Sequence, residues 1–128
     1  MAETSPWIAI VDDDPAVLRA LSRLLRSRAF QVRTYGSGPE FLATLSDELP
    51  DCLIVDFQMP EMNGMELHQH IMMRDFAIPT ILITAHGDTA IYSQLAKDAL
   101  VARLRKPLQA EALFTAIHRA IGHPPDGG

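Results

Sequence analysis

The sequence predicts an α/β fold in which helices cover both faces of a five-stranded parallel sheet. Five short apolar segments alternate with longer segments of helical period along the 128 residues, which is the pattern of repeated βα units. The apolar segments are residues 7–11, 31–35, 52–55, 79–84 and 100–105. One domain of this class, residues 1–122, is expected, and residues 123–128 (HPPDGG) have the composition of a linker or tail.

The polarity of these segments predicts their order in the sheet. Residues 7–11, 52–55 and 80–83 are apolar on both faces, as expected for central parallel strands. Residues 31–35 alternate, and so do residues 100–105, where Arg103 and Arg105 share one face and Leu100, Ala102 and Leu104 the other. Alternation is typical of edge strands. We therefore predict the doubly wound order 2-1-3-4-5, whose ligand crevice lies at the ends of the first and third strands.

Two helical stretches have a clear apolar face, and one has a start signal. Asp14 followed by Pro15 is typical of an N-cap and a first helical position, so Asp14 is interpreted as a cap. The apolar face of the first helix comprises Val17, Leu18, Leu21, Leu24 and Leu25, and that of the last comprises Leu113, Phe114, Ile117 and Ile121.

Composition limits the classes of function. The net charge of −5 without a basic run argues against direct nucleic-acid contact by this domain. The single cysteine, Cys52, cannot form an internal disulfide, and the first residues do not resemble a secretory signal, so a cytoplasmic location is expected. No apolar run approaches the roughly 18 residues of a membrane span.

Clustered charges occur where three of the predicted strands end. Asp12 and Asp13 follow the first strand, Asp56 follows the third, and Lys106 follows the fifth. Because parallel strands end on one side of a sheet, these groups are expected to converge. A hard divalent cation such as Mg²⁺ would relieve the repulsion between the carboxylates. With a hydroxyl from Thr84, the set is sufficient for phosphoryl transfer to Asp56.

Four motifs resemble the receiver domain of two-component response regulators. They are residues 10–15 (IVDDDP), 53–64 (LIVDFQMPEMNG), 83–88 (ITAHGD) and 105–108 (RKPL), in that family's order and spacing. The third motif is most similar to the FixJ-type regulators. The resemblance covers nearly the whole chain and implies a flavodoxin-like, CheY-like (βα)5 fold. It also implies a signalling role, in which a sensor histidine kinase transfers a phosphoryl group to Asp56.

The resemblance assigns roles to individual residues. It implies that Asp13, Asp56 and the main-chain carbonyl of Gln58 bind Mg²⁺ directly, with Asp12 helping through water. Thr84 and Lys106 would hold the phosphoryl oxygens, and the peptide bond between Lys106 and Pro107 is expected to be cis.

The resemblance also suggests partners. Relatives commonly dimerise through the helix before the fifth strand, that strand and the last helix, with Ile91, Tyr92 and Leu95 as candidates here. A C-terminal DNA-binding output domain usually follows such a receiver, and none is contained in this chain.

Three positions could modify signalling. The family usually has an aromatic residue where this chain has Arg103, and we hypothesise that Arg103 contributes to a signalling face through charge or dimer contacts. Gln58 and His86 lie two residues after Asp56 and Thr84, where each could orient or exclude a hydrolytic water.

Two other classes of function are weighed against a phospho-acceptor. A phosphohydrolase of the haloacid dehalogenase type would use Asp12 as nucleophile in its Asp-x-Asp motif, but Pro15 stands where that family expects glycine, and Asp56 would be superfluous. An interaction module that keeps the fold without phosphorylation is the second alternative, which Arg103 and the absence of the family's usual glycine before the fifth strand make conceivable.

Overall fold

The computed structural model describes residues 7–45, 48–85 and 100–122. Several sequence-based predictions therefore concern residues outside the described ranges. These are the role of His86 in hydrolysis, the dimer contacts of Ile91, Tyr92 and Leu95, and the tail at residues 123–128. The elements in chain order are β1 (Trp7–Val11), α1 (Pro15–Arg26), β2 (Gln31–Tyr35), α2 (Gly38–Ala43), β3 (Cys52–Asp56), α3 (Gly64–Met73), β4 (Thr80–Thr84), β5 (Leu100–Arg105) and α4 (Ala110–Ile121).

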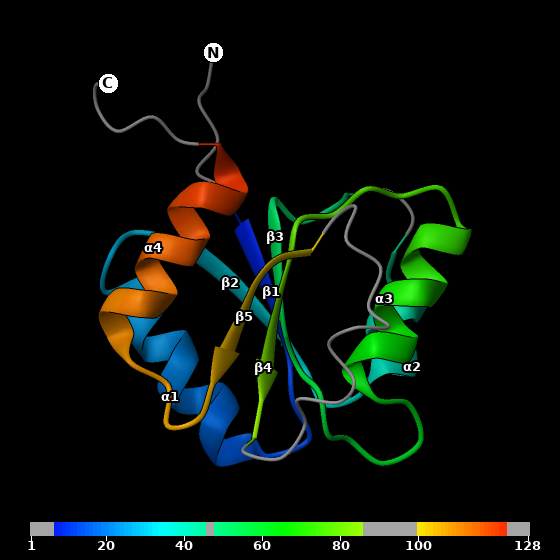
Figure 1. Cartoon of the computed structure of the whole chain (residues 1–128), viewed down its shortest axis with the longest axis horizontal. Helices are drawn as coiled ribbons and strands as arrows, with labels where there is room; N and C mark the ends of the chain where they lie inside the picture. Colours follow the sequence, from blue (N-terminus) through cyan, green and yellow to red (C-terminus); the bar gives the residue numbers. More distant parts are fainter. Residues whose placement is uncertain (1–6, 46–47, 86–99, 123–128) are drawn as a thin grey trace.

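The strands form one parallel sheet in the order β2-β1-β3-β4-β5, which confirms the predicted order. Helices α1 and α4 cover one face of the sheet, and α2 and α3 cover the other (Figure 1). Because all strands run in the same direction, their carboxyl ends lie together at the lower edge in this view. This is the edge at which the candidate charged residues are expected.

Side chains of the central strands divide between two buried layers. Ile8 and Ile10 of β1 pack in the layer under α1 and α4, and Ala9 and Val11 pack in the layer under α2 and α3. β3 and β4 are buried along their whole length. The apolar faces predicted for α1 and α4 point into the first layer, with Leu21, Leu25, Leu113, Phe114 and Ile117 buried.

The edge strands largely follow the predicted alternation. In β5, Ala102 and Leu104 pack against the core, whereas Arg103 and Arg105 are exposed on the other face. β2 is an edge strand as predicted, and it buries one residue on each face: Val32 on one and Tyr35 on the other, which also carries the exposed Arg33. Tyr35 is buried because its ring packs edge-on against the Phe41 ring of α2, with the ring centroids 5.1 Å apart.

Helix ends follow local signals. Asp14 is the N-cap of α1, and its side chain accepts a hydrogen bond of 2.9 Å from the Ala16 N–H. Asn63 and Glu66 form a capping box at the start of α3, with bonds of 2.8 and 2.9 Å. Within the described residues, no helix is long and apolar enough to cross a membrane.

Candidate functional site at the carboxyl edge of the sheet

β1 delivers two carboxylates to the site. Asp12 directly follows the strand and is 4% exposed, and its main-chain N–H donates to the Tyr35 carbonyl at 3.1 Å. Its carboxylate oxygen Oδ1 accepts a 2.9 Å hydrogen bond from the Asp14 N–H, which fixes the turn into α1. Asp13, which lies between Asp12 and Asp14 in the sequence, is exposed. The three consecutive aspartates therefore have different roles, and Asp14 is a cap as predicted.

β3 delivers Asp56, its last residue, which is 5% exposed. The loop that follows is held tightly, because the Phe57 N–H donates to the Ile83 carbonyl at 2.8 Å and the Gly64 N–H donates to the Phe57 carbonyl at 2.9 Å. A Cβ at Gly64 would lie 2.7 Å from the main-chain oxygen of Asp56. The start of α3 thus packs directly against the backbone of the candidate acceptor.

β4 and β5 bring the hydroxyl and the ammonium group. Thr84, the last residue of β4, is fully buried, and its carbonyl accepts a 2.9 Å hydrogen bond from the Lys106 N–H. The peptide bond between Lys106 and Pro107 is cis, as the family resemblance leads one to expect. The Lys106 ammonium nitrogen Nζ lies 3.3 Å from the Asp56 carboxylate oxygen Oδ1.

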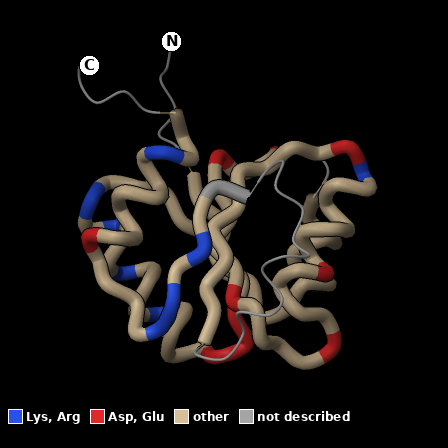
Figure 2. Tube along the Cα trace, in the orientation of Figure 1, with Lys and Arg blue, Asp and Glu red and all other residues tan. Residues whose placement is uncertain are grey.

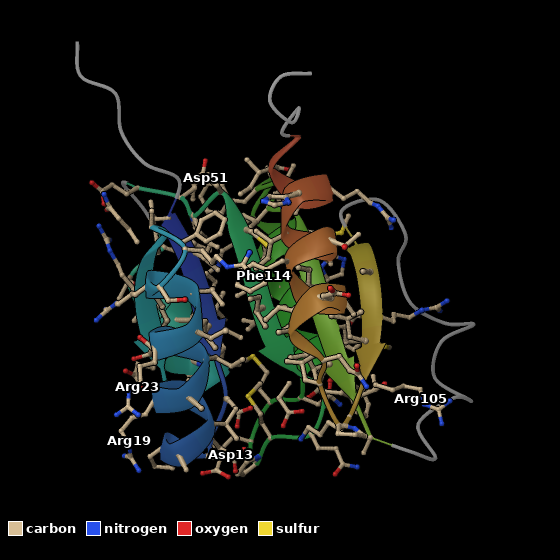
Figure 3. All side chains as sticks on the ribbon, turned by 90° about the vertical axis from the view of Figure 1, so that its left-hand side faces the viewer. Asp13, Arg19, Arg23, Asp51, Arg105 and Phe114 are labelled. Atoms are coloured by element: carbon tan, nitrogen blue, oxygen red, sulfur yellow. The ribbon has the colours of Figure 1, made fainter. Side chains whose placement is uncertain are left out.

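The carboxylates converge as predicted. One oxygen from each of Asp12, Asp13 and Asp56 lies within 4.8 Å of the others, and of the three only Asp13 is exposed. Side chains that are far apart in the sequence therefore form one acidic cluster with Lys106 at its side. Figure 3 places Asp13 at the end of the molecule where α1 begins, and Figure 2 shows acidic residues at the same edge of the sheet.

The cluster is electrostatically costly in the absence of a cation. Burial raises the pKa of the Asp12 carboxyl, and the neighbouring Asp56 and Asp13 raise it further, while the hydrogen bond from Asp14 and the charge of Lys106 lower it. Burial likewise raises the pKa of the Asp56 carboxyl, and Lys106 is the main opposing influence. One ammonium group does not neutralise three carboxylates.

The donor set fits a hard divalent cation. Carboxylate oxygens are the ligands that Mg²⁺ prefers, and the open, exposed side at Asp13 leaves room for water and a phosphoryl oxygen. Gln58 is exposed beside the cluster, and its main chain hydrogen-bonds the Asp56 side chain. Gln58 also lines an open cavity of about 490 Å³ together with Phe57, Met59, Pro60 and Asn63.

Sequence reasoning did not identify one contact of the site and one buried residue of α3. The contact between Gly64 and the Asp56 backbone was not predicted, although the Asn63–Glu66 capping pattern marks the helix start beside it. The burial of His68 on α3, at 2% exposure, was also not predicted. His68 is not part of the metal-binding cluster, which comprises Asp12, Asp13 and Asp56 among the described residues.

The chain belongs to the response regulator receiver domain family, whose model matches residues 8–118. It is therefore a receiver domain of a two-component system, a class of signalling domain in which phosphorylation on an aspartate is typical. The family resemblance seen in the sequence is thus confirmed, and so is the flavodoxin-like architecture.

Several characterised proteins are similar to this chain. It is 36% identical over 121 residues to the response regulator protein TodT of Pseudomonas putida, an alignment that covers 94% of the chain and 53% of TodT. It is 34% identical to the transcriptional regulatory protein FixJ of Rhizobium meliloti, covering 94% of the chain and 59% of FixJ. The chain thus spans about half the length of these relatives. Among solved structures, the FixJ-N crystal structure superimposes with a TM-score of 0.85 at 32% identity, covering 95% of the chain and 98% of FixJ-N.

Proposed function

We propose that Asp56 accepts a phosphoryl group from the phosphohistidine of a sensor histidine kinase. The observation that carries this proposal is the convergence of Asp12, Asp13, Asp56 and Lys106 at one edge of the sheet, within a chain of the receiver family. A carboxylate oxygen of Asp56 attacks phosphorus as the P–N bond of the phosphohistidine breaks, and the departing imidazole keeps the electron pair and takes up a proton.

The remaining residues position and neutralise the reacting groups. Asp13, Asp56 and the Gln58 carbonyl would hold Mg²⁺ directly, with Asp12 acting through water. When bound, the ion supplies positive charge against the phosphoryl oxygens. The Lys106 ammonium nitrogen lies 3.3 Å from the Asp56 carboxylate oxygen Oδ1 and would form an ion pair with one phosphoryl oxygen after transfer. The Thr84 hydroxyl would donate a hydrogen bond to a second phosphoryl oxygen. Phosphoryl transfer mainly requires such positioning and charge compensation.

The proposed domain acts as a switch and is not a conventional enzyme, although it assists its own phosphorylation and dephosphorylation. Gln58 is exposed beside Asp56, where it can influence the approach of a hydrolytic water. His86, the second residue proposed for this role, lies outside the described residues. Measuring the lifetime of the phosphorylated chain for Gln58→Ala and His86→Ala tests both roles, and an unchanged lifetime rejects the role for that residue.

The proposal extends to the assembly. Residues 1–122 would form the receiver and residues 123–128 a tail or linker, with a DNA-binding output domain outside this chain. The similarity to FixJ, which is named as a transcriptional regulatory protein, supports the proposed output domain.

We also propose a homodimer, because receiver domains of this family commonly dimerise. Its interface would comprise the helix before β5, β5 itself and α4, and Arg103 is exposed on β5. The family relationship also supports a cytoplasmic location.

Incubation with acetyl phosphate and Mg²⁺ separates this function from its alternatives. The wild-type chain should acquire an acyl phosphate that strong acid and alkali both hydrolyse, and Asp56→Asn should acquire none. A haloacid dehalogenase-type mechanism predicts labelling that survives Asp56→Asn and is lost in Asp12→Asn. An interaction module without phosphorylation predicts no labelling of the wild-type chain.

A further inference from the structure

Methionines gather on one side of the candidate phosphorylation site. Five of the six methionines of the chain lie between residues 59 and 73, in the loop that follows Asp56 and in helix α3. None of these five is buried, and Met73 is 79% exposed. A thioether that solvent can reach is readily oxidised to the sulfoxide, which turns an apolar side chain into a polar one. The segment therefore places oxidisable groups beside the proposed acceptor.

Met62 holds the loop after Asp56 against α2. Its side chain packs on the core layer under α2 and α3, two helices that lie side by side on the same face of the sheet (Figure 1). A Cβ at Gly38, the first residue of α2, would lie 2.7 Å from the Met62 sulfur, so the sulfur rests directly on the backbone of α2. Met73, in contrast, extends into solvent and does not belong to that layer of the described residues. Of these two methionines, only Met62 therefore anchors the loop.

The anchored loop carries one of the proposed Mg²⁺ ligands, the Gln58 carbonyl. The main chain of Gln58 also hydrogen-bonds the Asp56 side chain. The loop is tightly turned, because the Met62 N–H donates to the Pro60 carbonyl at 2.7 Å and Glu61 between them has a left-handed backbone with a φ of 69°. Such a conformation costs energy in a residue other than glycine and persists only where the surrounding structure holds it. Loss of the Met62 contact would therefore release the loop and misplace the ligand.

A small oxidant can reach the Met62 side chain from solvent. Met62 is half-buried and lines an open cavity of about 260 Å³ on the outer side of α3. Glu61 and Glu66 also line this cavity, together with Met73. The two carboxylates would repel an anionic oxidant, whereas a neutral peroxide can enter.

We propose that Met62 is a redox-sensitive modification site, at which oxidation by hydrogen peroxide weakens the binding of Mg²⁺. This inference rests on the proposed function and adds a form of regulation to the same site. A lone pair of the sulfur attacks one peroxide oxygen, the S–O bond forms as the O–O bond breaks, and the second oxygen leaves with both protons as water. The sulfur is oxidised and the peroxide is reduced. The sulfoxide is polar and larger than the thioether, so it does not retain the apolar contact with Gly38 and the core layer.

Treatment of the purified chain with hydrogen peroxide tests this role. Peptide mass spectrometry measures the sulfoxide fraction at each methionine, and calorimetric titration measures the affinity for Mg²⁺. Thermal unfolding in EDTA measures the stability of the metal-free chain. The variants are Met62→Leu, which keeps an apolar side chain that peroxide does not oxidise, and Met73→Leu as the matched control on α3. Before oxidation, both variants should bind Mg²⁺ within about twofold of wild type, because leucine and methionine have similar volumes.

Met73 should be oxidised first, because it is the more exposed, and its sulfoxide should leave both properties unchanged. The later appearance of Met62 sulfoxide should weaken Mg²⁺ binding about tenfold and lower the melting temperature in EDTA by about 4 °C. Met73→Leu should respond as wild type does, and Met62→Leu should lose less than about twofold in affinity. Methionine sulfoxide reductases should restore the oxidised wild-type chain.

An equal loss of Mg²⁺ affinity in Met62→Leu and wild type would overturn the inference. So would a wild-type affinity that follows the Met73 sulfoxide fraction, or one that stays unchanged when Met62 is oxidised. The wild-type time course decides the question even where Met62→Leu does not fold. An unoxidised chain that acetyl phosphate and Mg²⁺ do not label would instead overturn the proposed function, and the melting temperatures in EDTA would still report whether Met62 anchors the loop.

Discussion

The Lys106 ammonium nitrogen lies 3.3 Å from the Asp56 carboxylate oxygen Oδ1, although 50 residues separate them in the chain. The contact exists because β3 and β5 both end at the same edge of the sheet, on either side of β4. Lys106 is the only basic residue that forms an ion pair with this cluster among the described residues. It thus compensates part of the negative charge that a divalent cation would also compensate.

Replacing Lys106 should affect metal binding and phosphorylation in opposite directions. Lys106→Ala removes a positive charge that opposes Mg²⁺, so the affinity of the metal-free chain for Mg²⁺ should increase by about threefold at low salt. Phosphorylation by acetyl phosphate should slow by at least about tenfold, because the phosphoryl oxygens lose a charged partner. Calorimetric titration and a labelling time course measure the two effects. Arg119→Ala provides the control, and weaker Mg²⁺ binding by Lys106→Ala would contradict the argument.

The burial of Asp12 and its repulsion by the neighbouring carboxylates predict a stabilising substitution. The pKa of Asp12 is raised above the ordinary 3.8, mainly by burial. In the metal-free chain the folded state therefore loses stability relative to the unfolded state as pH rises above 3.8. Asp12→Asn removes this cost and retains an oxygen that can accept from the Asp14 N–H. At pH 7 and without Mg²⁺, its melting temperature should rise by about 3 °C, or roughly 1 kcal/mol.

The same variant should gain less than wild type when Mg²⁺ is added, since one of the three carboxylates is gone. Thermal unfolding with EDTA and with Mg²⁺, at pH 5 and pH 7, measures both effects. A variant that is less stable than wild type without metal at pH 7 would show that Asp12 stabilises the metal-free fold.

Gly64 should tolerate no larger residue. A Cβ there would meet the Asp56 main-chain oxygen at 2.7 Å and the Leu82 side chain at 2.8 Å, so α3 or the end of β3 must move. Gly64→Ala should lower the free energy of unfolding by about 2 kcal/mol. Gly36→Ala is the control, because its Cβ would only reach the Glu40 carboxylate at 3.4 Å. Denaturant unfolding that shows equal stability for the two variants would disprove the close contact.

Cys52 should make stability depend on alkaline pH. The thiol is fully buried in β3, and burial raises its pKa from 9.0 to about 12. Above pH 9.0 the thiol therefore ionises in the unfolded chain first, and stability is lost up to about pH 12. Between pH 8 and pH 10, wild type should lose roughly 1 kcal/mol more than Cys52→Val. An identical pH dependence of the two proteins in urea unfolding would refute the raised pKa.

The sheet was predictable because its strands carry distinct polarity patterns. Three central apolar segments and two alternating ones determine both the fold class and the strand order, and the ends of β1, β3 and β5 then place Asp12, Asp56 and Lys106 together. Parallel strands make this possible, since residues at equivalent strand ends meet whatever their separation in sequence.

Other features depend on tertiary packing that no local pattern contains. Tyr35 is buried because α2 brings Phe41 against it, and the polarity of β2 alone gives no sign of that contact. Gly64 is needed because α3 approaches the Asp56 backbone, a distance set by the packing of two elements. The ionisation of Asp12 and Asp56 likewise depends on burial and mutual distance and not on residue type.

The central claim is that the acidic cluster presents Asp56, and no other carboxylate, to the phosphoryl donor. Borohydride reduction of the chain after treatment with acetyl phosphate and Mg²⁺ converts a phosphorylated aspartate into homoserine, which peptide mass spectrometry locates. We predict homoserine at position 56 alone, and none when EDTA replaces Mg²⁺. Homoserine at position 12 or 13, or an unmodified chain in the presence of Mg²⁺, would contradict the account.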